Sequence, residues 1–133
     1  MKVVYYSETG NTESMAKMLE EALKGLGADV ELVDVADVSA ADLEGEAVFA
    51  LGCPAMGDEE LTDDMETLTT DLAAAGKKIG LFGSYDWGEG DWMRTWEQRL
   101  KDAGADVVGT VIANLEPDDE AKANLAELAK KLV

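Results

Sequence analysis

The chain opens with VVYYSETGNT, residues 3–12, in which an apolar run leads directly into a loop of hydroxyl, amide and glycine residues. Downstream, Met15, Leu19 and Leu23 recur at helical spacing and predict an amphipathic helix. A strand that delivers such a loop to a helix N-terminus suits phosphate binding, because free N–H groups and the helix dipole attract an anion there. The stretch therefore predicts the first strand, loop and helix of an α/β fold.

Residues 7–12 contain three hydroxyls, one amide and one glycine, but no lysine or arginine. A Walker A loop needs a lysine to reach the β and γ phosphates, and the dinucleotide fingerprint needs three glycines. The loop thus favours a terminal monophosphate held by neutral donors. Considered alone, it is equally compatible with a polar N-cap that binds nothing.

Apolar runs alternate with helical periodicity along the whole chain, and the predicted strands are residues 3–6, 30–35, 47–51, 79–82 and 107–113. Such alternation is typical of a parallel sheet with helices on both faces. For this length we predict one domain, residues 1–133, with a doubly wound five-stranded parallel sheet of order 2-1-3-4-5. Ligands of such sheets bind at the carboxyl ends of the strands, near the reversal of strand order.

The net charge of -18 and the pI near 4.1 argue against nucleic acid or an anionic membrane as a partner and favour a partner with a basic face. A single cysteine, Cys53, and no signal or membrane-length apolar segment indicate a reducing cytoplasm. Cys53 is most simply a small buried hydrophobe. The absence of histidine excludes histidine-based catalysis, and we predict no metal site and no catalytic residue.

Two further loops, residues 52–60 and 83–91, are rich in glycine, and each offers one apolar side chain that could contact a flat ring. Met56 and Trp87 could sandwich such a ring, because a thioether and an indole both make favourable contacts with π faces. Taken alone, Trp87 is more typical of a side chain that covers the core. A monophosphate loop facing a ring sandwich describes a site for flavin mononucleotide (FMN).

With these three loops, the sequence resembles a known family, the short-chain flavodoxins of anaerobic bacteria, over essentially its whole length. The most specific stretches are residues 9–13, 52–59, 81–85, 87–88 and 92–93. The resemblance implies a flavodoxin-like fold and a monomeric, low-potential one-electron carrier with non-covalently bound FMN. It is not an enzyme on this interpretation, and it shuttles electrons between redox enzymes.

The resemblance also implies roles for individual residues. By this resemblance the loop of residues 7–12 binds the phosphate of FMN, and Met56 and Trp87 contact the two faces of the flavin ring. Glu59 and the backbone amides of residues 86–88 bind the pyrimidine edge of that ring. The Gly57-Asp58 peptide is expected to turn its carbonyl toward N5 of the ring. The predicted cofactor-binding set is Ser7, Glu8, Thr9, Gly10, Asn11, Thr12, Pro54, Ala55, Met56, Gly57, Asp58, Glu59, Ser84, Tyr85, Asp86, Trp87, Gly88 and Asn114.

Three residues depart from the family pattern: Tyr6 replaces a usual tryptophan, and Glu8 and Asp86 each replace a usual glycine. We expect Glu8 to point to solvent, because a carboxylate beside a phosphate dianion is repelled. A glycine with positive φ would disfavour most replacements, although aspartate tolerates that conformation better than most residues.

Acidic residues crowd the second and third loops: Asp58, Glu59, Glu60, Asp63, Asp64, Asp86, Glu89 and Asp91. Their field would oppose added negative charge on the ring and steer a basic reductase or ferredoxin-like oxidoreductase toward the site. For Asp63 and Asp64 we prefer a simpler role at a helix N-terminus.

Three other classes of protein fit the sequence less well. A receiver domain needs an aspartate after the third strand and a lysine after the fifth, where Cys53 and Asn114 stand. A low-molecular-weight phosphatase needs an arginine that closes its cysteine loop, but Glu59 occupies that position. An FMN-dependent reductase that uses a nicotinamide donor needs a further nucleotide site, for which the chain has little spare length or positive charge.

Overall fold

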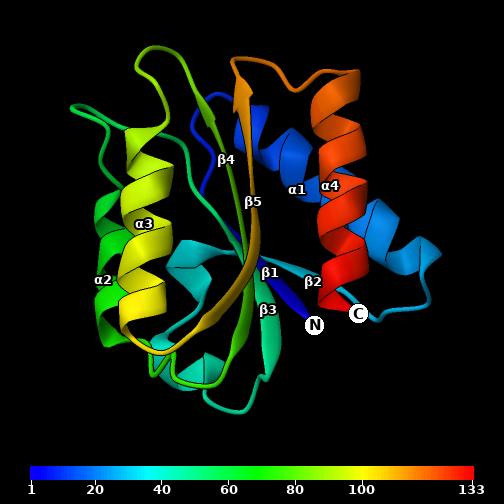
Figure 1. The fold of residues 1–133 in the computed structure, drawn as a ribbon, viewed down its shortest axis with the longest axis vertical. Coiled ribbons are helices and arrows are strands. Elements are labelled where there is room, and N and C mark those ends of the chain that lie inside the picture. The colour runs from blue at the N-terminus through cyan, green and yellow to red at the C-terminus, as the bar shows by residue number, and fades with distance from the viewer.

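The computed structural model describes residues 1–133 and contains one five-stranded parallel sheet with the order β2-β1-β3-β4-β5 (Figure 1). This order confirms the prediction. The strands are β1 (Lys2–Tyr5), β2 (Glu31–Asp34), β3 (Val48–Gly52), β4 (Lys78–Tyr85) and β5 (Asp106–Asn114).

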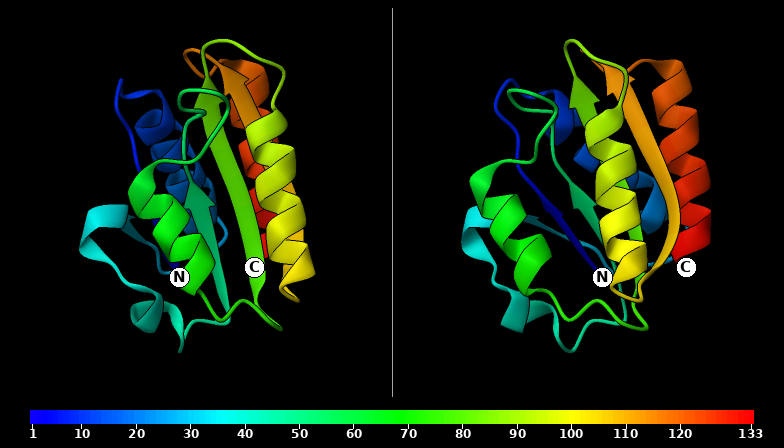
Figure 2. Two further views of the ribbon diagram at one scale, coloured as in Figure 1. Left: turned by 90° about the vertical axis from the view of Figure 1, so that its left-hand side faces the viewer. Right: turned by 60° about the vertical axis from the view of Figure 1, so that its left-hand side comes forward.

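Four helices cover the two faces of the sheet: α1 (Asn11–Gly25), α2 (Asp63–Asp71), α3 (Asp91–Asp102) and α4 (Asp119–Leu132). Helices α1 and α4 lie side by side on one face, and α2 and α3 lie on the other (Figures 1 and 2). The first-turn position of Asp63 and Asp64 in α2 agrees with the helix-terminal role preferred for them. None of the helices is long and apolar enough to cross a membrane.

Strands β1, β3, β4 and β5 divide their side chains between two cores, as the alternation of side chains along a strand requires. In β3, Phe49 and Leu51 join the core beneath α2 and α3, whereas Ala50 joins the core beneath α1 and α4. Because both faces are covered, the central strands appear in the sequence as continuous apolar runs. This double burial places every strand end, and the loops after β1, β3 and β4, at fixed positions.

Strand β4 extends three residues beyond the predicted 79–82 segment, to Tyr85. Gly83 and Ser84 pair with Ile112 and Ala113 of β5, although glycine and serine resemble loop residues in the sequence. A Cβ at Gly83 would lie 2.1 Å from the carbonyl oxygen of Cys53. Glycine is therefore required there for close backbone packing rather than for a turn.

The predicted strand 30–35 is shorter than expected, because β2 ends at Asp34 and a 3₁₀ turn, Val35–Asp37, follows. The Asp34 side chain ends the strand by accepting a 2.9 Å hydrogen bond from the Ala36 N–H. A second 3₁₀ turn, Ala40–Leu43, lies in the acidic segment between β2 and β3. Leu43 is buried and anchors this segment to the core.

Candidate cofactor-binding site

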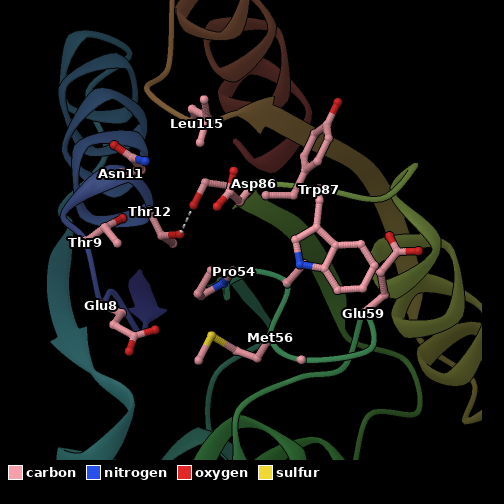
Figure 3. A pocket seen from close by; sticks show the side chains of 14 residues that line it. Glu8, Thr9, Asn11, Thr12, Pro54, Met56, Glu59, Asp86, Trp87 and Leu115 are labelled. Atoms are coloured by element: carbon pink, nitrogen blue, oxygen red, sulfur yellow. Dashed lines mark hydrogen bonds between the residues drawn. The ribbon is translucent and has the colours of Figure 1, made fainter.

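A cavity of about 280 Å³ lies at the carboxyl end of the sheet. Its walls come from the loops after β1, β3 and β4 and from the residue that follows β5 (Figure 3). The lining residues are Glu8, Thr9, Asn11, Thr12, Pro54, Ala55, Met56, Gly57, Glu59, Ser84, Tyr85, Asp86, Trp87 and Leu115.

The first wall is the loop before α1, which is organised by Ser7. The Ser7 Oγ accepts hydrogen bonds from the N–H groups of Gly10 and Glu13, each at 3.1 Å. Gly10, at φ 94°, starts the helix without a side-chain cap, and the N–H groups of Asn11 and Thr12 have no acceptor within the chain. These free donors fit an anionic oxygen at the positive end of α1.

No lysine or arginine lines the cavity, so the donors available to an anion are neutral, as the sequence predicted. Glu8 is exposed but belongs to the lining, and its carboxylate therefore stands at the cavity rim. A monophosphate fits this donor set better than a polyphosphate, which usually needs a cation.

Thr12 and Ser84 connect the first wall to β4 through their hydroxyl groups. Their Oγ atoms lie 2.8 Å apart, and the side chains are 1% and 5% exposed. One hydroxyl donates to the other, which leaves a single hydroxyl proton of the pair for another acceptor. The pair therefore fixes the start of α1 relative to the floor of the cavity.

The second wall is a closed turn between Met56 and Glu60. The two residues exchange backbone hydrogen bonds of 2.9 and 2.8 Å, which hold the ends of the turn. Gly57, at φ 51°, has no other atom within 4 Å of the position that a Cβ would take. The turn is thus anchored at its ends and sterically free at Gly57.

Glu59 links the second wall to the third. Its Oε1 accepts hydrogen bonds from the N–H groups of Gly90 at 3.0 Å and Asp91 at 2.9 Å, at the N-terminus of α3. Its Oε2 accepts no hydrogen bond within the chain, and Glu59 is one of the residues that line the cavity. Gly88 allows the approach, because a Cβ on Gly88 would lie 2.7 Å from the Glu59 Cδ.

Trp87 belongs to the third wall and is 60% exposed, so the interpretation of this residue as a cover for the core is wrong. Trp92 and Trp96 fill that role: both are buried, and their indole N–H groups donate to the Cys53 carbonyl and the Thr69 hydroxyl at 3.1 and 3.0 Å. Trp87 and Met56 both line the cavity, from two different loops (Figure 3).

Asp86 carries no backbone strain, because the non-glycine residues with positive φ are Glu59 and Leu115 only. The replacement of a family glycine by aspartate is therefore tolerated here without a left-handed conformation. Cys53 is buried, and burial raises the pKa of its thiol to about 11. A thiol of this kind is unreactive at neutral pH, which agrees with its interpretation as a small hydrophobe.

Five predicted binding residues do not line the cavity: Ser7, Gly10, Asp58, Gly88 and Asn114. Their contact with a cofactor stays a prediction. The Asn114 side chain donates instead through Nδ2 to the carbonyl oxygens of Tyr85 at 3.3 Å and Asp86 at 3.2 Å. Leu115 lines the cavity although nothing in the sequence pointed to it, because a leucine before Glu-Pro gives no signal of a left-handed turn.

Comparison with known proteins gives a consistent result. The family model described as Flavodoxin matches residues 3–130. The flavodoxin of Megasphaera elsdenii is 51% identical over 98% of both chains, and that of Clostridium beijerinckii is 42% identical over 99% of this chain and 98% of its own. The solution structure of two-electron reduced Megasphaera elsdenii flavodoxin superposes with a TM-score of 0.89, covering 98% of each chain at 52% identity.

The match extends over the fold and over almost the whole length of the chain. This chain belongs to the flavodoxin family, in its short-chain form, whose members are FMN-binding electron-transfer proteins and not enzymes.

Proposed function

We propose that the 280 Å³ cavity holds one FMN non-covalently and that the protein carries single electrons at low potential between redox enzymes. The observation that supports this most strongly is the convergence of three loops, from β1, β3 and β4, on one cavity that contains neutral anion donors and two flat or soft apolar side chains. We further propose that residues 1–133 act as one domain and as a monomer in the cytoplasm.

The phosphate would bind the N–H groups of Asn11 and Thr12 and the neighbouring hydroxyls, where the helix dipole favours an anion. Met56 and Trp87 would bind the two faces of the ring. The free Oε2 of Glu59 and the backbone of residues 86–88 would bind its polar edge, because both offer hydrogen-bonding groups there.

When bound, FMN supplies a ring that accepts electrons singly, with protonation at N5. The protein's own contribution begins at Gly57, where the peptide to Asp58 can turn its carbonyl toward the added proton. Gly57 makes this turn inexpensive, since glycine adopts positive and negative φ with similar ease and no neighbouring atom obstructs it.

The acidic residues around the cavity would set the low potential. Asp86 and Glu59 line the cavity, and no cation lines it to balance them. Arg94, in the first turns of α3, is already paired with Asp91. An additional negative charge on the ring is therefore opposed by the surrounding field.

Titration calorimetry with FMN and with riboflavin tests the proposal. Two charge-assisted hydrogen bonds to the phosphate contribute about 3 kcal/mol or more, so FMN should bind roughly 10²-fold more tightly than riboflavin. The substitution Asn11→Ala removes a side-chain amide donor that lines the cavity and should reduce this ratio, whereas Asn124→Ala, on α4, should leave it unchanged. Equal affinities for FMN and riboflavin would show that the loop before α1 does not bind phosphate.

A further inference from the structure

Backbone strain is concentrated at the cavity. Nine residues have positive φ, and seven of them are glycines. The two others are Glu59, at φ 58°, and Leu115, at φ 59°, and both line the cavity. A side chain in the left-handed region is unfavourable, and residues held in this way cluster at ligand-binding sites.

Hydrogen bonds from Leu115 itself and from the preceding Asn114 hold the chain in this conformation at the end of β5. The Leu115 N–H donates to the Tyr85 carbonyl at 2.7 Å, and Asn114 Nδ2 donates to the carbonyls of Tyr85 and Asp86. The end of β5 is thereby fixed to the loop after β4. In Figure 3 Leu115 lies at the cavity between Asn11 and Asp86.

Leucine is a poor choice for this position if the position is only a turn. Asparagine or glycine would adopt the left-handed conformation more easily, and a polar residue would suit the 48% exposure of the side chain. Leu26 is similarly exposed, at 46%, but has an ordinary φ of -93°. Leu115 thus combines two unfavourable features, and a contact with a bound apolar surface offsets both.

We propose that Leu115 is a further wall of the FMN pocket, an inference that rests on the proposed function. Its side chain packs against the cofactor beside the segment that joins the phosphate loop to the ring-binding loops. The left-handed backbone is the strain that this contact requires. Since the Leu115 side chain is apolar and uncharged, the contact acts on the ring and on the carbon skeleton of the attached chain, and not on the phosphate.

Two variants separate the contact from the strain. Leu115→Ala removes most of the side chain but keeps the Cβ that causes strain, whereas Leu115→Asn also relieves the strain. Both variants should bind FMN and riboflavin more weakly by the same factor, roughly ten-fold, because apolar contact area is lost. The urea midpoint of the apoprotein should rise for Leu115→Asn and stay at the wild-type value for Leu115→Ala. The control, Leu26→Ala, should change neither ligand affinity.

If Leu115→Ala kept the wild-type dissociation constants, or lost affinity for FMN but not for riboflavin, the inference would be overturned while the proposed function stands. An apoprotein midpoint that falls in both variants would show that Leu115 only supports the fold, and this also overturns it. If the wild-type protein itself fails to bind FMN, the proposed function is wrong, and the inference is wrong with it. Calorimetry and apoprotein unfolding together therefore distinguish the two failures.

Discussion

Gly57 is the residue at which local backbone chemistry bears most directly on function. It lies at φ 51° with open space around its Cβ position, within a turn whose ends are fixed by the Met56–Glu60 hydrogen bonds. A substitution there changes the conformational preference of one peptide without creating a clash. Its effect can therefore be assigned to the backbone alone.

We predict that Gly57→Ala lowers the potential of the first electron by about 40 mV, because a Cβ penalises the required conformer by about 1 kcal/mol. FMN affinity in the oxidised state should change much less. Gly45→Ala is the control, since Gly45 also has open space but no positive φ. Anaerobic potentiometric titration measures the potential of the first electron. If this potential were unchanged in Gly57→Ala, Gly57 would be only a turn residue.

The sequence predicted most of the residues that line the cavity, because its loops contain uncommon combinations of residues. Thr9, Met56 and Trp87 were all predicted and all line the cavity. Leu115 was missed because its conformation is imposed by a hydrogen bond to Tyr85, which is distant in sequence. The link from Glu59 to Gly90 and Asp91 was missed for the same reason.

Among the elements, α2 and α3 are joined by one bidentate ion pair. Arg99 Nη1 and Nη2 donate to Glu66 Oε1 and Oε2 at 2.9 and 2.6 Å. The hydrogen bond from Arg99 holds the pKa of Glu66 below its ordinary value of 4.5. A carboxylate with a lowered pKa in the folded state stabilises the protein above its unfolded pKa, and this contribution is lost as the pH falls through the folded value.

We predict that Glu66→Gln lowers the free energy of unfolding at pH 7 by a few tenths of a kcal/mol, roughly the contribution of a half-exposed pair. The difference from wild type should disappear in acid, once Glu66 is protonated. Urea unfolding at several pH values measures it. Glu127→Gln is the matched control, because the Glu127–Lys130 pair is more exposed. A difference that persists at acidic pH would mean that the substitution acts through packing.

The sequence located all five strands and indicated helices between them, since burial on both faces of the sheet produces clear apolar runs. The ends were less accurate, because tertiary contacts decide them. The extension of β4 to Tyr85 depends on pairing with β5. The 3₁₀ turn after β2 depends on the local hydrogen bond from the Ala36 N–H to the Asp34 side chain. The pattern of apolar residues does not show that this hydrogen bond ends the strand.

Over the whole molecule, the net charge of -18 gives the protein a long-range field that is strongest in effect at low salt. Acidic residues follow β3 and β4, beside the cavity. A redox partner with a basic face would be attracted toward this edge, and the attraction would be screened over a Debye length of about 10 Å at 0.1 M salt.

We predict that the second-order rate of electron transfer to a basic protein acceptor falls steeply as ionic strength rises. Stopped-flow measurements from low to high salt give this rate. A small neutral acceptor is the control, and its rate should vary little. If the rate with the protein acceptor also did not depend on ionic strength, the negative charge would contribute to solubility and not to the encounter with a redox partner.

We propose above that FMN occupies the cavity formed by the loops after β1, β3 and β4 and by Leu115. Amide chemical shifts of the ¹⁵N-labelled apoprotein, recorded before and after one equivalent of FMN, test it most directly, because the ring current of the flavin perturbs adjacent amides. We expect the largest changes in residues 8–12, 55–59, 84–88 and 115. Largest changes between α2 and α3, in residues 60–66 and 95–99, would contradict it.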